Sequence, residues 1–414
     1  MKWAAALALL SIMLAILLAG RAAQAAELPL PWVQLADDGT LSVRAVVAPN
    51  GTCPVVLADG KAVAARSRAL ADDKFPVRVC EARVPAATAA LTVGGGAMPV
   101  LPAAVQRLVV IGDTGCRIAG RVAQDCNDPA AWPFRTIAAR AAARRPDLVI
   151  HVGDYYYREK ECPAGHAGCA GSPYGDNWPV WRAEFFDPGA ALLAAAPWVM
   201  VRGNHESCRR GGQGWVRLLE PHAGPLACAE RTEPYRLAIG ALSLLVFDSA
   251  DADDLKLEAD KVKVAGEQFA RLLDQAPPSS WLVTHRPVWA LAQAQLAGVG
   301  MNQTLQAAIR GQVPAGLDMV LAGHLHDFMS YEFGPERPSQ LVVGTGGDNL
   351  LELADMPAVG TEIDGMPVTR AFALQRFGYL VLDRMPQGWG GAFYAPDDTI
   401  LARCRLTGRE LDCR

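Results

Sequence analysis

The sequence has no excess of basic residues and no long apolar run beyond its N-terminal segment. Its 39 Lys and Arg are outnumbered by 43 Asp and Glu, which gives a formal net charge of -4. A chain with this charge does not bind nucleic acid through a general basic field. It also has no internal repeat, and a composition of 51% hydrophobic and 20% charged residues excludes disordered, collagen-like and coiled-coil chains. The 414 residues are therefore expected to form a globular protein of two or three domains.

The first 25 residues have the pattern of a secretory signal. Lys2 precedes an apolar run over residues 3–18, and small residues follow up to the Ala-Gln-Ala triplet at residues 23–25. This pattern predicts cleavage after Ala25. An uncleaved anchor helix is the alternative, but the run is shorter than the roughly 20 residues that span a bilayer. We expect an exported protein, periplasmic or secreted, without stable membrane insertion.

Export changes the interpretation of the ten cysteines. In an oxidising compartment an even number of cysteines favours disulfides over thiolate metal sites. A zinc knuckle built from Cys162, His166 and Cys169 is an alternative, although Gly and Ala fill its interior and no second Cys/His pair lies nearby. Each cysteine has a close neighbour in the sequence, and we hypothesise five local bridges: Cys53–Cys80, Cys116–Cys126, Cys162–Cys169, Cys208–Cys228 and Cys404–Cys413.

Residues 26–102 are predicted to form a small β-rich domain that ends in a linker. Short alternating or β-branched runs at Leu41–Val47, Pro76–Cys80 and Leu91–Val93 are separated by turn-forming residues. The stretch 94–102 is rich in Gly and Pro and is typical of a linker. No pattern that carries chemistry occurs in this segment, so we expect a structural or substrate-flanking role.

From residue 103 to residue 414 the pattern changes to alternating strands and helices. Arg107–Ile111 and Asp147–Val152 are buried-strand runs, and residues 130–145 between them have a helix pattern rich in Ala and Arg. Such a unit predicts an α/β fold with parallel strands covered by helices. Residues 341–405 are strand-rich, as a second sheet would be. Further apolar runs occur at residues 198–201, 242–247, 281–283 and 318–322.

Polar residues follow these apolar runs directly. Ligands bind just beyond the carboxyl ends of the strands in open α/β sheets. In four of the five cases Gly precedes the polar residue, which would let the backbone turn sharply. Five strands that each deliver an oxygen or an imidazole to one edge predict a polynuclear metal site. The residues are Asp113, Asp154, Asn204 with His205, His285, and His324 with His326.

These motifs resemble those of the calcineurin-like metallophosphoesterase superfamily. The resemblance covers about residues 105–330 and depends most on Gly-Asn-His-Glu at 203–206 and Gly-His-Leu-His at 323–326. It implies a metallophosphoesterase domain over residues 103–414 with an αββα two-sheet sandwich, preceded by the small N-terminal all-β domain.

Tyr157 narrows the resemblance, because a tyrosine three residues after Asp154 is the pattern of the purple acid phosphatases. In that family the tyrosine binds ferric iron as a phenolate. The alternative for this sequence is that Tyr157 faces substrate without contacting iron. Carried over to this sequence, the family pattern implies two metal ions, Fe(III) and a divalent Zn, Mn or Fe. Asp113, Tyr157 and His326 would hold the ferric ion, Asn204, His285 and His324 the divalent ion, and Asp154 would bridge them.

The residue types suit these ions. Phenolate and carboxylate are hard oxygen donors for trivalent iron, whereas imidazole and an amide oxygen suit a divalent ion. Two ions about 3.5–4 Å apart clamp a phosphate and yield a metal-bound hydroxide for in-line attack on phosphorus. His205 is the candidate general acid for the leaving alkoxide, the alternatives being a further metal ligand or a structural imidazole. Glu206 is expected to orient an imidazole, and Arg286 and Arg202 either contact phosphate or are structural.

The sequence thus predicts an exported dinuclear-metal phosphatase that hydrolyses small phosphate monoesters. One alternative is a metallophosphodiesterase of the same superfamily that acts on nucleotides or phospholipid head groups. The other is a non-catalytic exported metal- or phosphate-binding protein, against which His205 argues, because a binder needs no proton donor.

Overall fold

The computed structural model describes Leu28 and residues 30–119, 122–224, 226–274, 276–291, 300–351 and 359–414. The signal segment expected at residues 1–25 lies outside the described residues. Among the helices that are described, none is both long and apolar enough to cross a membrane.

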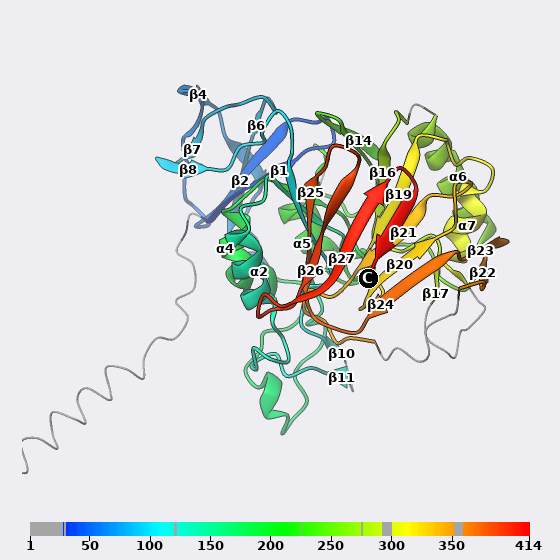
Figure 1. Cartoon of the computed structure of the whole chain (residues 1–414). Helices are drawn as coiled ribbons and strands as arrows, with labels where there is room; N and C mark the ends of the chain where they lie inside the picture. The colour runs from blue at the N-terminus through cyan, green and yellow to red at the C-terminus, as the bar shows by residue number, and fades with distance from the viewer. Residues whose placement is uncertain are drawn as a thin grey trace, which may run out of the picture.

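Two large sheets dominate the described part of the chain (Figure 1). The first has the strand order β28 (Glu410–Cys413), β27 (Ile400–Thr407), β26 (Trp389–Tyr394), β25 (Tyr379–Arg384), β9 (Arg107–Ile111), β12 (Leu148–His151), β13 (Trp198–Met200), β1 (Leu30–Leu35), β2 (Leu41–Val47), β6 (Arg78–Val84) and β5 (Arg66–Ala69). The second has the order β14 (Tyr235–Ile239), β15 (Leu242–Phe247), β16 (Ser280–Thr284), β19 (Leu317–Ala322), β21 (Ser339–Val343), β20 (Phe328–Glu332) and β24 (Arg370–Leu374).

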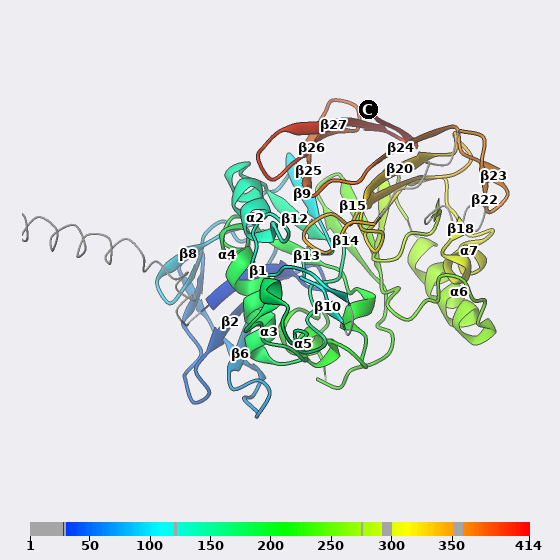
Figure 2. The same ribbon diagram turned by 90° about the horizontal axis from the view of Figure 1, so that it is seen from below.

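The two sheets pack face to face, and helices cover their outer faces (Figure 2). Strand β9 has apolar side chains on both faces, so both faces must be covered. Leu108 and Val110 point into the core between the sheets, whereas Val109 and Ile111 point into the core under α2 (Phe134–Ala143) and α4 (Asp187–Leu193). A strand buried on both faces reads as a continuous apolar run, which is how the sequence marks it. The mixed α/β sandwich predicted from the sequence is confirmed.

Helices α6 (Ala259–Leu273) and α7 (Gln303–Ile309) cover the second sheet. The buried positions of α6 recur every three or four residues, which places them on one face of the helix: Ala265, Gln268, Phe269, Leu272 and Leu273. The shorter elements are α3 (Trp178–Trp181), α5 (Gly212–Leu218), a π-helical segment Arg182–Phe186, 3-10 turns Ala167–Cys169 and Asn204–Glu206, and the strand pairs β10 (Ile118–Ala119) with β11 (Val122–Ala123), β17 (Ala290–Leu291) with β18 (Gly300–Met301) and β22 (Glu362–Ile363) with β23 (Met366–Pro367).

The N-terminal region is all-β, as predicted, and four of its strands extend the first large sheet. Strand β1 runs parallel to β13, with Gln34 opposite Trp198. Its other strands, β3 (Val56–Ala58), β4 (Lys61–Val63), β7 (Leu91–Val93) and β8 (Gly96–Met98), form a four-stranded sheet. The expected linker 94–102 therefore contains a strand, because Gly94 and Gly95 adopt positive φ angles and turn the chain from β7 into β8.

The C-terminal strands also differ from the expectation of one second sheet. Strands β21 and β24 belong to the second sheet, but β25 pairs antiparallel with β9 and carries β26, β27 and β28 into the first sheet. A run of strand patterns does not reveal which sheet each strand joins, since partners are set by contacts distant in sequence.

The five hypothesised disulfides are all confirmed, and every cysteine of the described residues is paired. Because Cys162 and Cys169 are bonded to each other, the zinc-knuckle alternative is wrong.

Candidate metal centre

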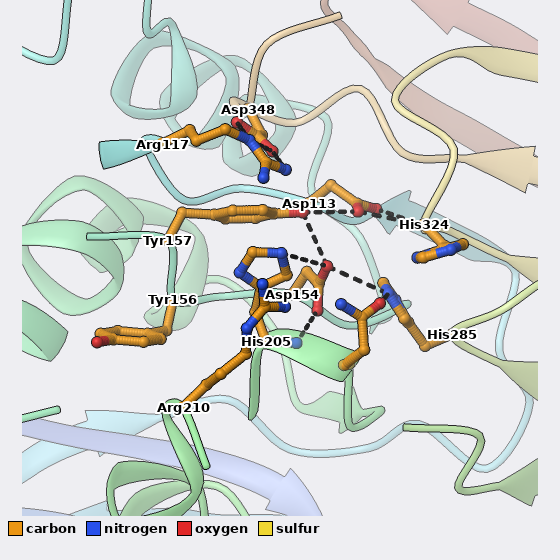
Figure 3. A network of polar contacts seen from close by, with 12 residues as sticks. Asp113, Arg117, Asp154, Tyr156, Tyr157, His205, Arg210, His285, His324 and Asp348 are labelled. Carbon is orange, nitrogen blue, oxygen red and sulfur yellow. Dashed lines mark hydrogen bonds and ion pairs between the residues drawn. The ribbon is translucent and has the colours of Figure 1, made fainter. Parts of the chain in front are cut away.

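The polar residues that follow strands of both sheets gather in one place (Figure 3). Three of them adopt left-handed backbone conformations: Asp113 (φ 54°), Asp154 (φ 61°) and His324 (φ 70°). They follow β9, β12 and β19, respectively. Such conformations are costly for residues with a side chain and concentrate at functional sites.

Four glycines precede site residues directly, and most of them do not turn the chain. They are Gly112, Gly153, Gly203 and Gly323. Of the four, only Gly153 has a positive φ angle. A Cβ atom at Gly203 would lie 2.0 Å from Asp154 Oδ1, and one at Gly323 would lie 2.5 Å from Asp113 Oδ2. The expectation that all four glycines provide a sharp turn is therefore corrected: two of them make room for the neighbouring carboxylates.

The site consists of two clusters of side chains, and Tyr157 lies at the centre of the first, with Asp113, Asp154 and His326. Its hydroxyl oxygen is 2.8 Å from Asp154 Oδ2, 3.1 Å from Asp113 Oδ1 and 3.0 Å from His326 Nε2. The side chains of all four residues are buried or nearly so. The structure thus brings together the phenol, the two carboxylates and the imidazole that the purple acid phosphatase pattern implied.

The second cluster consists of Asn204, His285 and His324, and it shares Asp154 with the first cluster. His285 Nε2 lies 3.2 Å from Asp154 Oδ2 and 3.1 Å from Asn204 Oδ1. Asp154, His285 and His324 each offer a ligand atom, and these atoms lie within 4.8 Å of one another. Asp154 is the residue common to both clusters, as expected of a bridging carboxylate.

Hydrogen bonds set which ring nitrogen each imidazole presents to the site. Nδ1 of His285 lies 2.8 Å from the Val152 carbonyl, and Nδ1 of His326 lies 2.8 Å from the Asn349 carbonyl. Both rings therefore present Nε2. His324 is the reverse: its Nε2 lies 2.9 Å from Asp254 Oδ2 and 3.0 Å from Arg286 Nη1, which leaves Nδ1 for the site.

The electrostatics of the protein without ions fit a cation site. Burial lowers the pKa of His285, but Asp154 and Asp113 outweigh it and raise the value to about 9. Burial also opposes ionisation of Tyr157, and Asp154 and Asp113 add to the effect, so its pKa is raised well above 10. Acidic groups buried this closely gain most from cations placed between them. The donor set is therefore that of a metal centre.

His205 borders the site without belonging to either cluster. Its backbone N–H donates to Asp154 Oδ1 at 2.9 Å, its Nδ1 lies 2.8 Å from Glu159 Oε1, and its Nε2 lies 4.0 Å from Asp154 Oδ2. Burial lowers its pKa, and the two carboxylates oppose the shift. Figure 3 shows His205 and Arg117 on opposite sides of the Tyr157 ring. The His205 and Tyr157 ring centroids are 3.9 Å apart, and the Arg117 guanidinium carbon lies 4.7 Å from the Tyr157 ring centroid.

Glu206 does not orient an imidazole, and that expectation is corrected. Its buried carboxylate accepts backbone N–H groups from Gly203, Asp154, Tyr155 and Tyr156 at 2.8–3.0 Å. It therefore fixes the loop that carries Asp154.

Three carboxylates that sequence reasoning missed contact the imidazoles, and each is paired with an arginine. Asp348 lies 3.3 Å from Nε2 of His326, the nitrogen that this ring presents to the site. Nothing in the local sequence marks Glu159 or Asp254, whereas Asp348 directly follows the Gly-Thr-Gly-Gly run at 344–347 after β21, a signal that could have found it. Glu159 contacts His205 and Arg210, Asp254 contacts His324 and Arg286, and Asp348 contacts His326 and Arg117.

The arginines singled out from the sequence have structural partners. Arg202 donates to the Glu206 carbonyl at 3.0 Å and pairs with Asp248 at 3.2 Å. Arg286 is paired with Asp254, and its Nη1 lies 3.0 Å from His324 Nε2. His151, which the motifs did not include, is the last residue of β12, and its Nε2 lies 2.9 Å from Thr114 Oγ1.

A family model described as calcineurin-like phosphoesterase matches residues 106–328, more than half of the chain. The chain belongs to the calcineurin-like phosphoesterase family. Membership implies a dinuclear metal centre and hydrolysis of phosphoesters as the general chemistry.

Solved structures show the same fold at low sequence identity. A purple acid phosphatase, PPD1, from yellow lupin (Lupinus luteus) seeds is 15% identical, with a TM-score of 0.58 over 90% of this chain and 73% of that chain. PhoD is 14% identical, with a TM-score of 0.56 over 93% of this chain and 92% of that chain. No curated protein matches the sequence significantly.

Proposed function

We propose that this calcineurin-like phosphoesterase is an exported phosphatase that hydrolyses phosphate monoesters with a purple acid phosphatase-type centre. The observation that carries the proposal is the position of the Tyr157 hydroxyl, within 3.1 Å of Asp113, Asp154 and His326. A phenol among two carboxylates and an imidazole is a donor set for a hard trivalent ion. The five disulfides support export, and we propose that the signal is cleaved after Ala25.

In this proposal Asp113, Tyr157 and His326 would hold Fe(III), and Asn204, His285 and His324 would hold a divalent Zn, Mn or Fe ion, with Asp154 shared. When bound, two such ions neutralise the phosphate and activate a water molecule as the nucleophile. The protein's own contribution is to fix the ligands, through Glu206 on the Asp154 loop and through the carbonyls that hold the imidazoles.

His205 is proposed to donate the proton to the leaving alkoxide. Glu159 holds Nδ1, so Nε2 faces the centre, 4.0 Å from the shared carboxylate. Burial lowers the pKa of His205, and Asp154 and Glu159 oppose this shift, so the two carboxylates favour the protonated ring that a proton donor needs.

Two substrates test the proposal against its closest rival. The metal-loaded protein is assayed with p-nitrophenyl phosphate and with bis-p-nitrophenyl phosphate. We expect faster hydrolysis of the monoester, and a loss of visible absorbance in Tyr157→Phe. Preference for the diester, with unchanged absorbance in the variant, would favour a metallophosphodiesterase. Two bound metals and no turnover of either ester would favour a non-catalytic binding protein.

A further inference from the structure

Asp254 lies in the segment between β15 and α6, outside the motifs singled out in the sequence. Its Oδ2 lies 2.9 Å from His324 Nε2 and forms an ion pair with Arg286 Nη1. That guanidinium nitrogen also lies 3.0 Å from His324 Nε2, but it donates to the closer carboxylate, which leaves Nε2 to donate to Asp254. Its Oδ1 accepts a hydrogen bond from Asn302 Nδ2 at 2.8 Å. Both carboxylate oxygens are therefore engaged, one of them by an imidazole of the metal centre.

The position of Asp254 is fixed by helix α7. Asn302 is fully buried and caps this helix, with Oδ1 accepting from the Leu305 N–H at 2.9 Å. The same side chain donates to Asp254 through Nδ2, and Gln303 N–H donates to the Asp254 carbonyl at 3.1 Å. The first turn of α7 thus holds the carboxylate against His324.

A carboxylate that accepts an imidazole N–H fixes the tautomer and makes the opposite nitrogen a better ligand. We propose that Asp254 is a positioning residue for the divalent-ion site, which accepts Nε2–H of His324 and presents Nδ1 toward Asp154 and His285. The inference rests on the metal assignment in the proposed function, but it concerns binding of the ion and not hydrolysis.

The same segment contains a second aspartate–arginine ion pair, which resembles Asp254–Arg286 but contacts no imidazole of the metal centre and therefore serves as a control. Asp251 forms a bidentate pair with Arg231, at 2.9 Å from Nη2 to each carboxylate oxygen. Asp251 lies three residues before Asp254 and is similarly enclosed, with 17% against 20% of its side chain exposed. A general effect of breaking an Asp–Arg pair in this segment should therefore be equal in the two variants.

The test is the affinity for Zn²⁺ alone, measured by chelator competition on the full chain with its divalent site emptied. Asp254→Asn is expected to weaken Zn²⁺ binding about 10- to 100-fold, and Asp251→Asn to leave it unchanged. Nitrogen-15 NMR of the metal-free protein should show the proton of His324 on Nε2, and a redistribution between the ring nitrogens in Asp254→Asn.

Thermal unfolding of the metal-free variants identifies those that fold. If Asp254→Asn does not fold, Asp254→Glu keeps the charge but displaces the carboxylate, and it should bind Zn²⁺ more weakly than the wild type. Unchanged affinity in a folded Asp254 variant, or an equal loss in Asp251→Asn, overturns the inference. Zn²⁺ binding that depends on Asp254 in a protein without phosphatase activity would leave the inference standing and refute the proposed function.

Discussion

Glu159 Oε1 lies 2.8 Å from His205 Nδ1, and the two residues come from different loops of the site. The contact leaves Nε2 of the ring for the substrate side. Arg210 lies 3.0 Å from the same oxygen and holds the carboxylate from the other direction. The general acid in this account is therefore a three-residue unit, of which the sequence motifs marked only the imidazole.

Replacing His205 by Ala should lower kcat about 10²- to 10⁴-fold while both metals remain bound. Glu159→Gln should cause a smaller loss, because the amide holds the ring less firmly. Since the two residues act together, the double variant should be no worse than His205→Ala. Steady-state kinetics with metal analysis measure this, and Glu161→Gln, an exposed acid of the same loop, is the control. Additive losses would show that Glu159 acts independently of His205.

The metal-free protein should lose stability as the pH rises from about 6.5 to 9. Asp154 raises the folded-state pKa of His285 to about 9, and Asp348 and Asp113 raise that of His326 to about 9, both against the effect of burial. Groups with a raised folded pKa stabilise fully below the unfolded value, about 6.5, and this contribution disappears as pH passes the folded value.

Each imidazole contributes on the order of 3 kcal/mol to this pH dependence. Urea unfolding in the presence of a chelator measures it across the pH range. His285→Gln should show a shallower dependence between pH 6.5 and 9 than the wild type. An identical slope in the variant would mean that the ring is not held as a cation in the metal-free fold.

Gly203→Ala should abolish metal binding at the shared carboxylate. The added Cβ would lie 2.0 Å from Asp154 Oδ1 and 2.3 Å from the Asp154 backbone nitrogen, so the carboxylate must move. The control is Gly266→Ala in α6, where the nearest atom is 3.5 Å away and the change should stabilise the helix by about 0.5–1 kcal/mol. Metal content by mass spectrometry distinguishes the two, and full occupancy in Gly203→Ala would contradict the geometry of the site.

Glu81 should be needed to keep the N-terminal strands in place. It pairs with Arg44, which is fully buried, and with Arg68; both arginines donate to the Glu220 carbonyl beyond α5. Glu81→Gln leaves buried guanidinium groups without their counter-charge and should cost about 3–5 kcal/mol. Exposed Glu410→Gln is the control, and urea unfolding that gives equal stabilities would refute this role.

Glu81 also predicts a weakening of the fold in acid. Burial opposes its ionisation, but Arg44 and Arg68 outweigh this and lower its pKa to about 2. A carboxyl group with a lowered pKa stabilises the fold above the unfolded value, near 4.5, and the contribution is lost as pH falls toward 2. The wild type should therefore lose stability more steeply than Glu81→Gln over this range in the same unfolding experiments.

Strands and metal-site motifs could be predicted from the sequence because both are local patterns. Leu41–Val47, Leu91–Val93, Arg107–Ile111 and Leu242–Phe247 agree with their strands to the residue. Local patterns do not tell which strands pair, so the merging of β1 with β13 and of β25 with β9 was not predicted.

Asp254 was missed for the same reason. Asp254 and His324 are 70 positions apart, and neither position predicts the other without the fold. The glycines were recognised but given the wrong reason at Gly203 and Gly323, since only coordinates show that a carboxylate occupies the space of the missing side chain.

The visible absorption spectrum of protein exported in an oxidising host, recorded with metal analysis, tests the central claim most directly. The account predicts two metals per chain and a phenolate-to-iron charge-transfer band that disappears in Tyr157→Phe. It predicts that Tyr156→Phe, in which the neighbouring ring stacks on Trp181 away from the ligands, keeps the band. Two metals per chain with no such band, or a band that survives in Tyr157→Phe, would contradict it.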